Sequence, residues 1–78
     1  MAVTTIRVQY RSGKPAAGYR VSLTFTSMLG GVTGTVSTDS QGMAQIQHSS
    51  SGSANVIVQG TTRLHNVHCP GEYAVTLD

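Results

Sequence analysis

Hydrophobic and polar residues alternate along most of the chain, and helical periodicity is almost absent. Ile6, Val8 and Tyr10 alternate with polar neighbours, and residues 19–26 repeat this pattern. A period of two residues is typical of a strand with one buried face. The pattern predicts further strands at residues 32–36, 44–48, 54–58, 63–67 and 73–77, and it places Ala44, Ile46 and His48 on one face of the strand at 44–48.

Residues that favour turns separate these strands. The side chain of Asp39 can bond to the backbone two residues on, and Gly42 tolerates a positive φ, so a tight turn is expected there. Loops, turns or breaks are expected at residues 12–18, 28–31, 39–42, 49–53, 60–62 and 69–71, of which 49–53 is interpreted as a hairpin loop. The inward face of the strand at 63–67 stays open, because Leu64 and Val67 have opposite parity.

Seven short strands separated by turn signals predict an all-β fold. We expect a seven-stranded antiparallel β-sandwich, immunoglobulin-like or prealbumin-like, with no significant helix. Because 78 residues leave room for one core, residues 1–78 are expected to form a single domain.

Three segments resemble the motifs of carboxypeptidase regulatory-like, transthyretin-like domains. Residues 13–23, GKPAAGYRVSL, are similar to the opening G-x-P-x-x-G-x-x-V-x-L of that family. Residues 38–42, TDSQG, resemble its T-D-x-x-G turn, and residues 70–77, PGEYAVTL, resemble its closing P-G-x-Y-x-V-x-L strand. The resemblance implies a prealbumin-like or immunoglobulin-like module that serves as a spacer, an adhesive unit or a docking surface.

Two chemical activities of related proteins do not fit these residues. Hydroxyisourate hydrolases of the transthyretin family end in Y-R-G-S, whereas this sequence ends in YAVTLD. Some pilin and adhesin modules carry a Lys–Asn or Lys–Asp isopeptide bond promoted by a buried acid. Lys14 and Glu72 both lie in polar turns, so we expect no isopeptide bond.

The charge and composition exclude several partners. Five Lys and Arg residues against three Asp and Glu are too few for the clustered cations that bind nucleic acid. No apolar run approaches the ~20 residues of a membrane-spanning helix, and the absence of Trp disfavours carbohydrate recognition.

A single Cys excludes an internal disulfide. The start of the sequence resembles no signal peptide, so we expect a cytoplasmic protein or one exported or assembled without a leader.

His48, His65, His68 and Cys69 are the candidate metal ligands, since imidazole and thiolate suit zinc or copper. On a regular strand His65 and His68 point to opposite faces, so a shared site would need a bulge or a second subunit. We therefore expect no metal and no cofactor, with these four residues kept as the alternative. The three acids and the absence of helices also favour a protein that is not an enzyme.

Arg7, Arg11 and Arg20 are the candidate interaction patch. If the first two strands form a hairpin that pairs Tyr10 with Tyr19, Arg7 and Arg20 lie diagonally across one face. The alternative is that these side chains only keep a Thr-rich face soluble.

We expect a non-catalytic structural or interaction module that docks into or decorates a larger assembly, through strand edges or sheet faces. A phage or virus-like particle, a secretion apparatus or a filament would suit it. The alternative function is a small metal- or ligand-binding protein.

Overall fold

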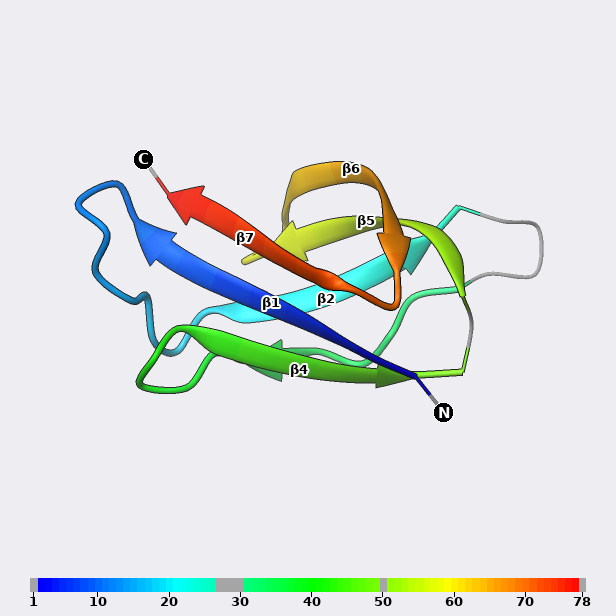
Figure 1. Cartoon of the computed structure of the whole chain (residues 1–78), viewed down its shortest axis with the longest axis horizontal. Coiled ribbons are helices and arrows are strands. Elements are labelled where there is room, and N and C mark those ends of the chain that lie inside the picture. The colour runs from blue at the N-terminus through cyan, green and yellow to red at the C-terminus, as the bar shows by residue number, and fades with distance from the viewer. Residues whose placement is uncertain (1, 27–30, 50, 78) are drawn as a thin grey trace.

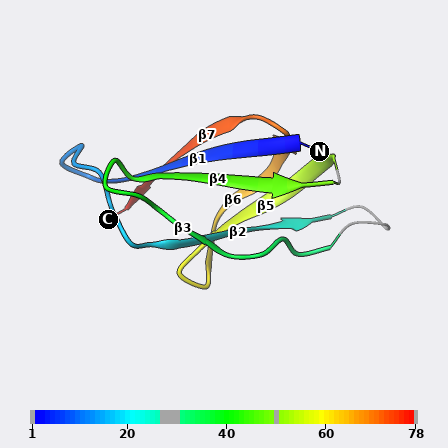
Figure 2. The same cartoon turned by 90° about the horizontal axis from the view of Figure 1, so that it is seen from below.

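The computed structural model describes residues 2–26, 31–49 and 51–77, and within them it contains seven strands and no helix. The strands are β1 (Ala2–Tyr10), β2 (Arg20–Phe25), β3 (Val36–Ser37), β4 (Met43–His48), β5 (Gly52–Val58), β6 (Thr61–Cys69) and β7 (Glu72–Leu77). They form a three-stranded sheet in the order β4-β1-β7 and a four-stranded sheet in the order β3-β2-β5-β6. The two sheets lie face to face, as in a sandwich (Figure 1, Figure 2). No helix long and apolar enough to span a membrane occurs in the described residues.

The core lies between the sheets, and the alternating pattern confirms which side chains fill it. Ile6 and Val8 of β1 are fully buried, while Arg7 between them is exposed. The buried hydrophobic side chains are Ile6, Val8, Ala16, Val21, Leu23, Phe25, Ala44, Ile46, Ala54, Val56, Val58, Cys69, Val75 and Leu77. Strands with one buried face give two layers that cover each other's apolar surface.

The expectation of a wholly antiparallel sandwich is wrong for one sheet. β1 pairs antiparallel with β4 but parallel with β7, in a register that places Thr5 opposite Glu72 and Arg7 opposite Ala74. The reason is topological: the chain crosses from the end of β6 into the other sheet, and β7 then runs beside β1 in the same direction (Figure 1). The sheet is therefore mixed.

The connection interpreted as a hairpin loop, and the one for which a hairpin was considered, both cross between the sheets. β1 and β2 lie in different sheets, so they form no hairpin. The loop between them first folds back on β1, where the Ala16 N–H donates to the Val8 carbonyl at 2.9 Å. β4 and β5 also lie in different sheets, so residues 49–53 do not form a hairpin loop. Alternation identifies the buried face of a strand but not its neighbour, so it does not show which consecutive strands pair.

The strand expected at 32–36 is largely replaced by a side-chain contact. Only Val36 and Ser37 form a strand, and Val32 makes one isolated bridge to Thr24. The Thr33 N–H donates to the Leu23 carbonyl, and the Thr33 hydroxyl accepts from the Leu23 N–H, both at 2.9 Å. The hydroxyl thus takes the place of a backbone acceptor, which interrupts the ladder. Within the neighbouring break expected at 28–31, residues 28–30 lie outside the described residues.

β6 resolves the opposite parity of Leu64 and Val67 with a bulge. Leu64 pairs with Val56 and Val67 with Ala54, so three steps along β6 match two along β5. Both Leu64 and Val67 pack against the core. Asn66 has a φ of 53°, and its N–H donates to the Asn55 side-chain oxygen at 3.0 Å. A bulge residue shifts the alternation by one, which is why both apolar side chains face inward.

Two tight turns connect consecutive strands. The expected turn at 39–42 is confirmed: the Gly42 N–H donates to the Asp39 carbonyl at 2.9 Å, and the Asp39 carboxylate accepts from Gln41 and Met43 N–H groups at 2.9 and 3.0 Å. β5 and β6 form a hairpin in which Val58 pairs with Thr61. Its two connecting residues, 59 and 60, both have positive φ, as the tightest hairpin turns require.

Candidate functional site

His48 is a core residue. It lies on the same face of β4 as Ala44 and Ile46, as predicted, and is only 6% exposed. Its Nε2 and the buried Thr4 hydroxyl share a hydrogen bond of 2.7 Å, and its ring centroid lies 5.2 Å from that of Phe25. These contacts account for its burial through packing and hydrogen bonding.

His65 and His68 lie on the outside of the molecule. Both are exposed on β6, so the expectation that they point to opposite faces is wrong, because the bulge at Asn66 changes the parity between them. Cys69 is fully buried, with its thiol 3.9 Å from the Val67 carbonyl oxygen. Within residues 2–26, 31–49 and 51–77, no three His, Cys, Asp or Glu side chains lie close enough together to hold a metal ion. The structure does not bring the four candidate ligands to one site.

The three candidate arginines lie in separate places. Arg7 is exposed on the outer face of the three-stranded sheet, and Arg20 is exposed at the start of β2 in the other sheet. Arg11 is exposed in the loop after β1. The hairpin that would have joined Arg7 to Arg20 does not form, because β1 and β2 belong to different layers.

Tyr10 and Tyr19 do meet, although their strands do not pair. The ring centroids lie 6.0 Å apart at an interplanar angle of 79°, and the Tyr10 hydroxyl donates to the Tyr19 hydroxyl at 3.4 Å. This hydrogen bond needs the neutral form of Tyr10, so it raises the pKa of that phenol, as do partial burial and repulsion from Tyr19.

We expect Tyr19→Phe to lower the pKa of Tyr10 towards its ordinary value of 10.0, because the acceptor of its hydrogen bond is removed. An NMR titration of the tyrosine ring carbons at alkaline pH measures this directly. Tyr73→Phe, which changes a ring outside the pair, should leave the titration of Tyr10 in place. An unchanged Tyr10 midpoint in Tyr19→Phe would show that the hydroxyl contact does not exist in solution.

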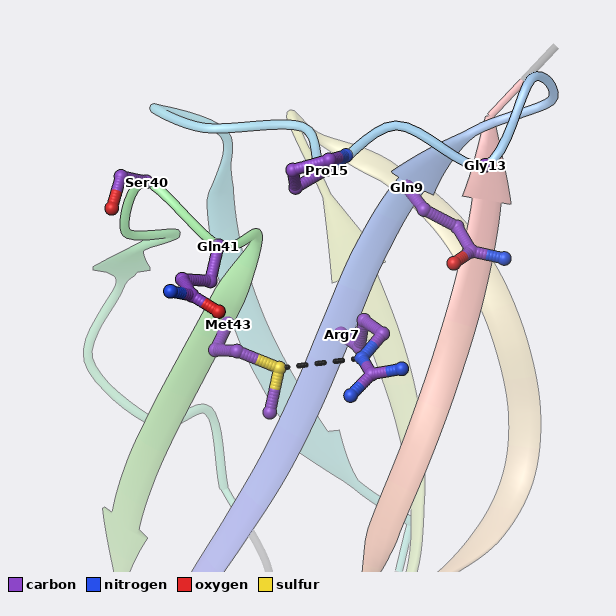
Figure 3. Close-up of a pocket in the computed structure, with 7 residues that line it drawn as sticks. All are labelled: Arg7, Gln9, Gly13, Pro15, Ser40, Gln41 and Met43. Atoms are coloured by element: carbon purple, nitrogen blue, oxygen red, sulfur yellow. Dashed lines mark hydrogen bonds between the residues drawn. The ribbon is translucent and has the colours of Figure 1, made fainter.

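A groove crosses the outer face of the three-stranded sheet at Arg7 (Figure 3). The floor of the groove is formed by Arg7 and Gln9 of β1 and Met43 of β4. Its walls are the loop at residues 13–15 and the turn at residues 40–41. The Arg7 Nε donates to the Met43 sulfur at 3.5 Å, which holds the guanidinium over the floor. Arg7 was predicted from the sequence, but its neighbours were not, since they come from segments that only the fold brings together.

Three of the four edge strands, β3, β6 and β7, differ in how well they are protected. β3 has two residues and lies against β4. β6 carries bulges together with the exposed side chains of Arg63, His65 and His68. Short strands, bulges and charges are the usual means by which proteins block pairing at a sheet edge. β7 is less protected, since it is six residues long, has no bulge, and carries a single charge, at Glu72.

The backbone of β7 shows which of its groups lie on the open side. The Thr5 N–H donates to the Gly71 carbonyl at 2.9 Å, which fixes the hydrogen-bonding register of β7 against β1. In a parallel pair, alternate residues direct both backbone groups to the same neighbour. The backbone groups of Tyr73, Val75 and Leu77 therefore point to β1, and those of Glu72, Ala74 and Thr76 point away from it. β1 is the only strand with which β7 pairs in the described part of the chain.

No protein-family model matches this chain, and no curated protein matches it significantly. The resemblance to transthyretin-like domains therefore has no support from these comparisons. The structure supports the coarser statement, an all-β domain of seven strands in two sheets.

Proposed function

We propose that this chain is a non-catalytic β-sandwich module that docks into, or decorates, a larger protein assembly. The observation that carries this proposal is the unprotected edge of β7. The N–H and C=O groups of Glu72, Ala74 and Thr76 are placed to accept a strand from a protein partner or from a second copy of the chain. Such strand addition uses backbone groups, so it needs no cofactor and no catalytic side chain.

The motifs of residues 13–23, 38–42 and 70–77 agree with this role, because the transthyretin-like domains that they resemble serve mainly as spacers and docking units. On this proposal the fold belongs to the prealbumin-like or immunoglobulin-like sandwiches. A phage or virus-like particle, a secretion apparatus or a filament is the setting that we propose. Nucleic acid and membrane are not proposed as partners.

The experiment that tests the proposal is light scattering on the wild type and on Ala74→Pro over a wide concentration range. Proline removes an N–H from the open edge and places its ring there, so strand addition should be blocked. We expect the wild type to associate as its concentration rises and Ala74→Pro to stay monomeric. Ala74→Val, which keeps the N–H, should associate as the wild type does.

Association that survives in Ala74→Pro would contradict docking at β7. A wild type that stays monomeric throughout would exclude a second copy as the occupant of this edge, and the proposed partner would then be a different protein. Metal analysis of the same peak tests the alternative function, since stoichiometric zinc or copper would favour a metal-binding protein.

A further inference from the structure

The groove over Arg7 is lined by one charged side chain, and that charge is positive. Of the five Lys and Arg residues of the protein, Arg7 lines the groove, Lys14 lies in sequence between the wall residues Gly13 and Pro15, and Arg11 precedes them in the same loop. Asp39 immediately precedes the turn at residues 40–41, which forms the other wall of the groove. Its carboxylate already accepts two backbone N–H groups in the turn. The side chains that line the groove therefore carry a single positive charge, that of Arg7.

The guanidinium of Arg7 is positioned but not neutralised. Its Nε donates to the Met43 sulfur, which is a weak and uncharged acceptor. Glu72 sits diagonally to Arg7 on the same face, because Thr5 pairs with Glu72 and Arg7 pairs with Ala74. Both line the hollow on the other side of Arg7, yet no ion pair joins Arg7 to a carboxylate of the described residues. Among the residues that the structure describes, the terminal Nη groups of Arg7 therefore have no anionic partner.

We infer that this groove binds a carboxylate side chain on an extended acidic segment of a partner protein. The planar fork of a guanidinium matches the two oxygens of a carboxylate, and such pairs are stronger than neutral hydrogen bonds. The Ser40 and Gln41 side chains at the wall (Figure 3) provide neutral donors and acceptors for the backbone of the segment. This inference concerns the sheet face and does not depend on docking at the edge of β7.

Two other occupants fit the charges less well. A nucleic-acid backbone repeats its phosphates along a track and is bound by several cations in line. The two remaining cations, Arg20 and Arg63, belong to strands of the other sheet, so no such track continues from the groove. A second copy of this chain is a poor source of acid, since the whole sequence has only three Asp and Glu residues.

The test is a fluorescence anisotropy titration of the protein against a labelled hexaglutamate peptide at low salt, where exposed charges are least screened. We expect saturable binding by the wild type and at least about tenfold weaker binding by Arg7→Gln, the loss of one good charge-assisted contact. Arg20→Gln makes the same change of charge on the opposite layer and should bind within about twofold of the wild type. Glu72→Gln should bind more tightly, because a competing negative charge next to Arg7 is removed.

Arg7→Lys tests the geometry of the guanidinium separately from its charge, because lysine keeps the charge but cannot make the bidentate contact. This variant should bind more tightly than Arg7→Gln and more weakly than the wild type. NMR shifts on titration should centre on Arg7, Gln41 and Met43.

Absence of binding by the wild type, or an equal loss in Arg20→Gln and Arg7→Gln, would overturn the inference. Tighter binding of an oligothymidylate of the same length would also overturn it, in favour of a phosphate ligand. Because Arg7 and Arg20 are both exposed, these variants should keep the wild-type amide spectrum away from the substituted site.

Discussion

Replacing Gly42 by alanine should destabilise the protein more than any other exchange of a glycine in the described turns. Gly42 has a φ of 77°, and a Cβ built on it would lie 2.3 Å from the Val8 carbonyl oxygen. That oxygen already accepts the Ala16 N–H, and the Val8 N–H donates to the Gly42 carbonyl at 2.7 Å. The added methyl group would therefore separate β1 from the turn and from the loop after β1 at the same time.

The expected cost is at least about 3 kcal/mol, from an unfavourable φ together with a clash against backbone. For a chain of this size that corresponds to a fall in Tm of about 12 °C or more, out of a total stability of roughly 4–12 kcal/mol. Thermal unfolding followed by circular dichroism measures it. Gly18→Ala is the matched control, because Gly18 has a φ of 78° but no atom within 4 Å of a built Cβ. Its loss should be about 1–2 kcal/mol, and equal losses in the two variants would show that the clash at Gly42 is absent.

Proline at two adjacent positions of β7 should lower the free energy of unfolding by very different amounts. Val75 is buried and directs its N–H to β1, so Val75→Pro removes a ladder hydrogen bond and disturbs the core, at an expected cost of about 3 kcal/mol or more. Ala74 is exposed and directs its N–H away from β1, so Ala74→Pro should cost less than about 1 kcal/mol, as prolines on an open strand edge do. The preceding residue, Tyr73, is extended, which is the conformation that a following proline requires.

Thermal unfolding of the two variants side by side measures this difference. Val75→Pro should lower the Tm by about 12 °C or more, and Ala74→Pro by less than about 8 °C. If Ala74→Pro unfolds as readily as Val75→Pro, the N–H of Ala74 has a partner and the edge of β7 is closed.

Alternation predicted which side chains of most strands are buried, because it depends only on the two-residue repeat of an extended chain. His48 was correctly placed on the face of Ala44 and Ile46 for this reason. Alternation left the inward face of residues 63–67 open, because it puts Leu64 and Val67 on opposite faces. The bulge with the positive φ of Asn66 turns both side chains towards the core.

Pairing between strands was harder to predict than burial. Nothing local to residues 5–10 or 73–77 shows that these two segments run parallel as neighbours, because that arrangement depends on where the chain crosses between the sheets. The candidate sites depend on the same long-range information. Arg7 is visible in the sequence, but Met43, which holds its guanidinium, is 36 residues away. The open edge of β7 can be recognised only once the order of strands in the sheet is known.

Amide hydrogen exchange in β7, followed by NMR in a dilute and a concentrated sample, tests most directly whether this edge is open and used for docking. In the dilute sample we expect slow exchange at Tyr73, Val75 and Leu77, which face β1, and fast exchange at Glu72, Ala74 and Thr76. In the concentrated sample protection should rise at the second set alone, as a second copy adds its strand. Slow exchange at all six residues in the dilute sample would mean that the edge is already covered, and would contradict the account.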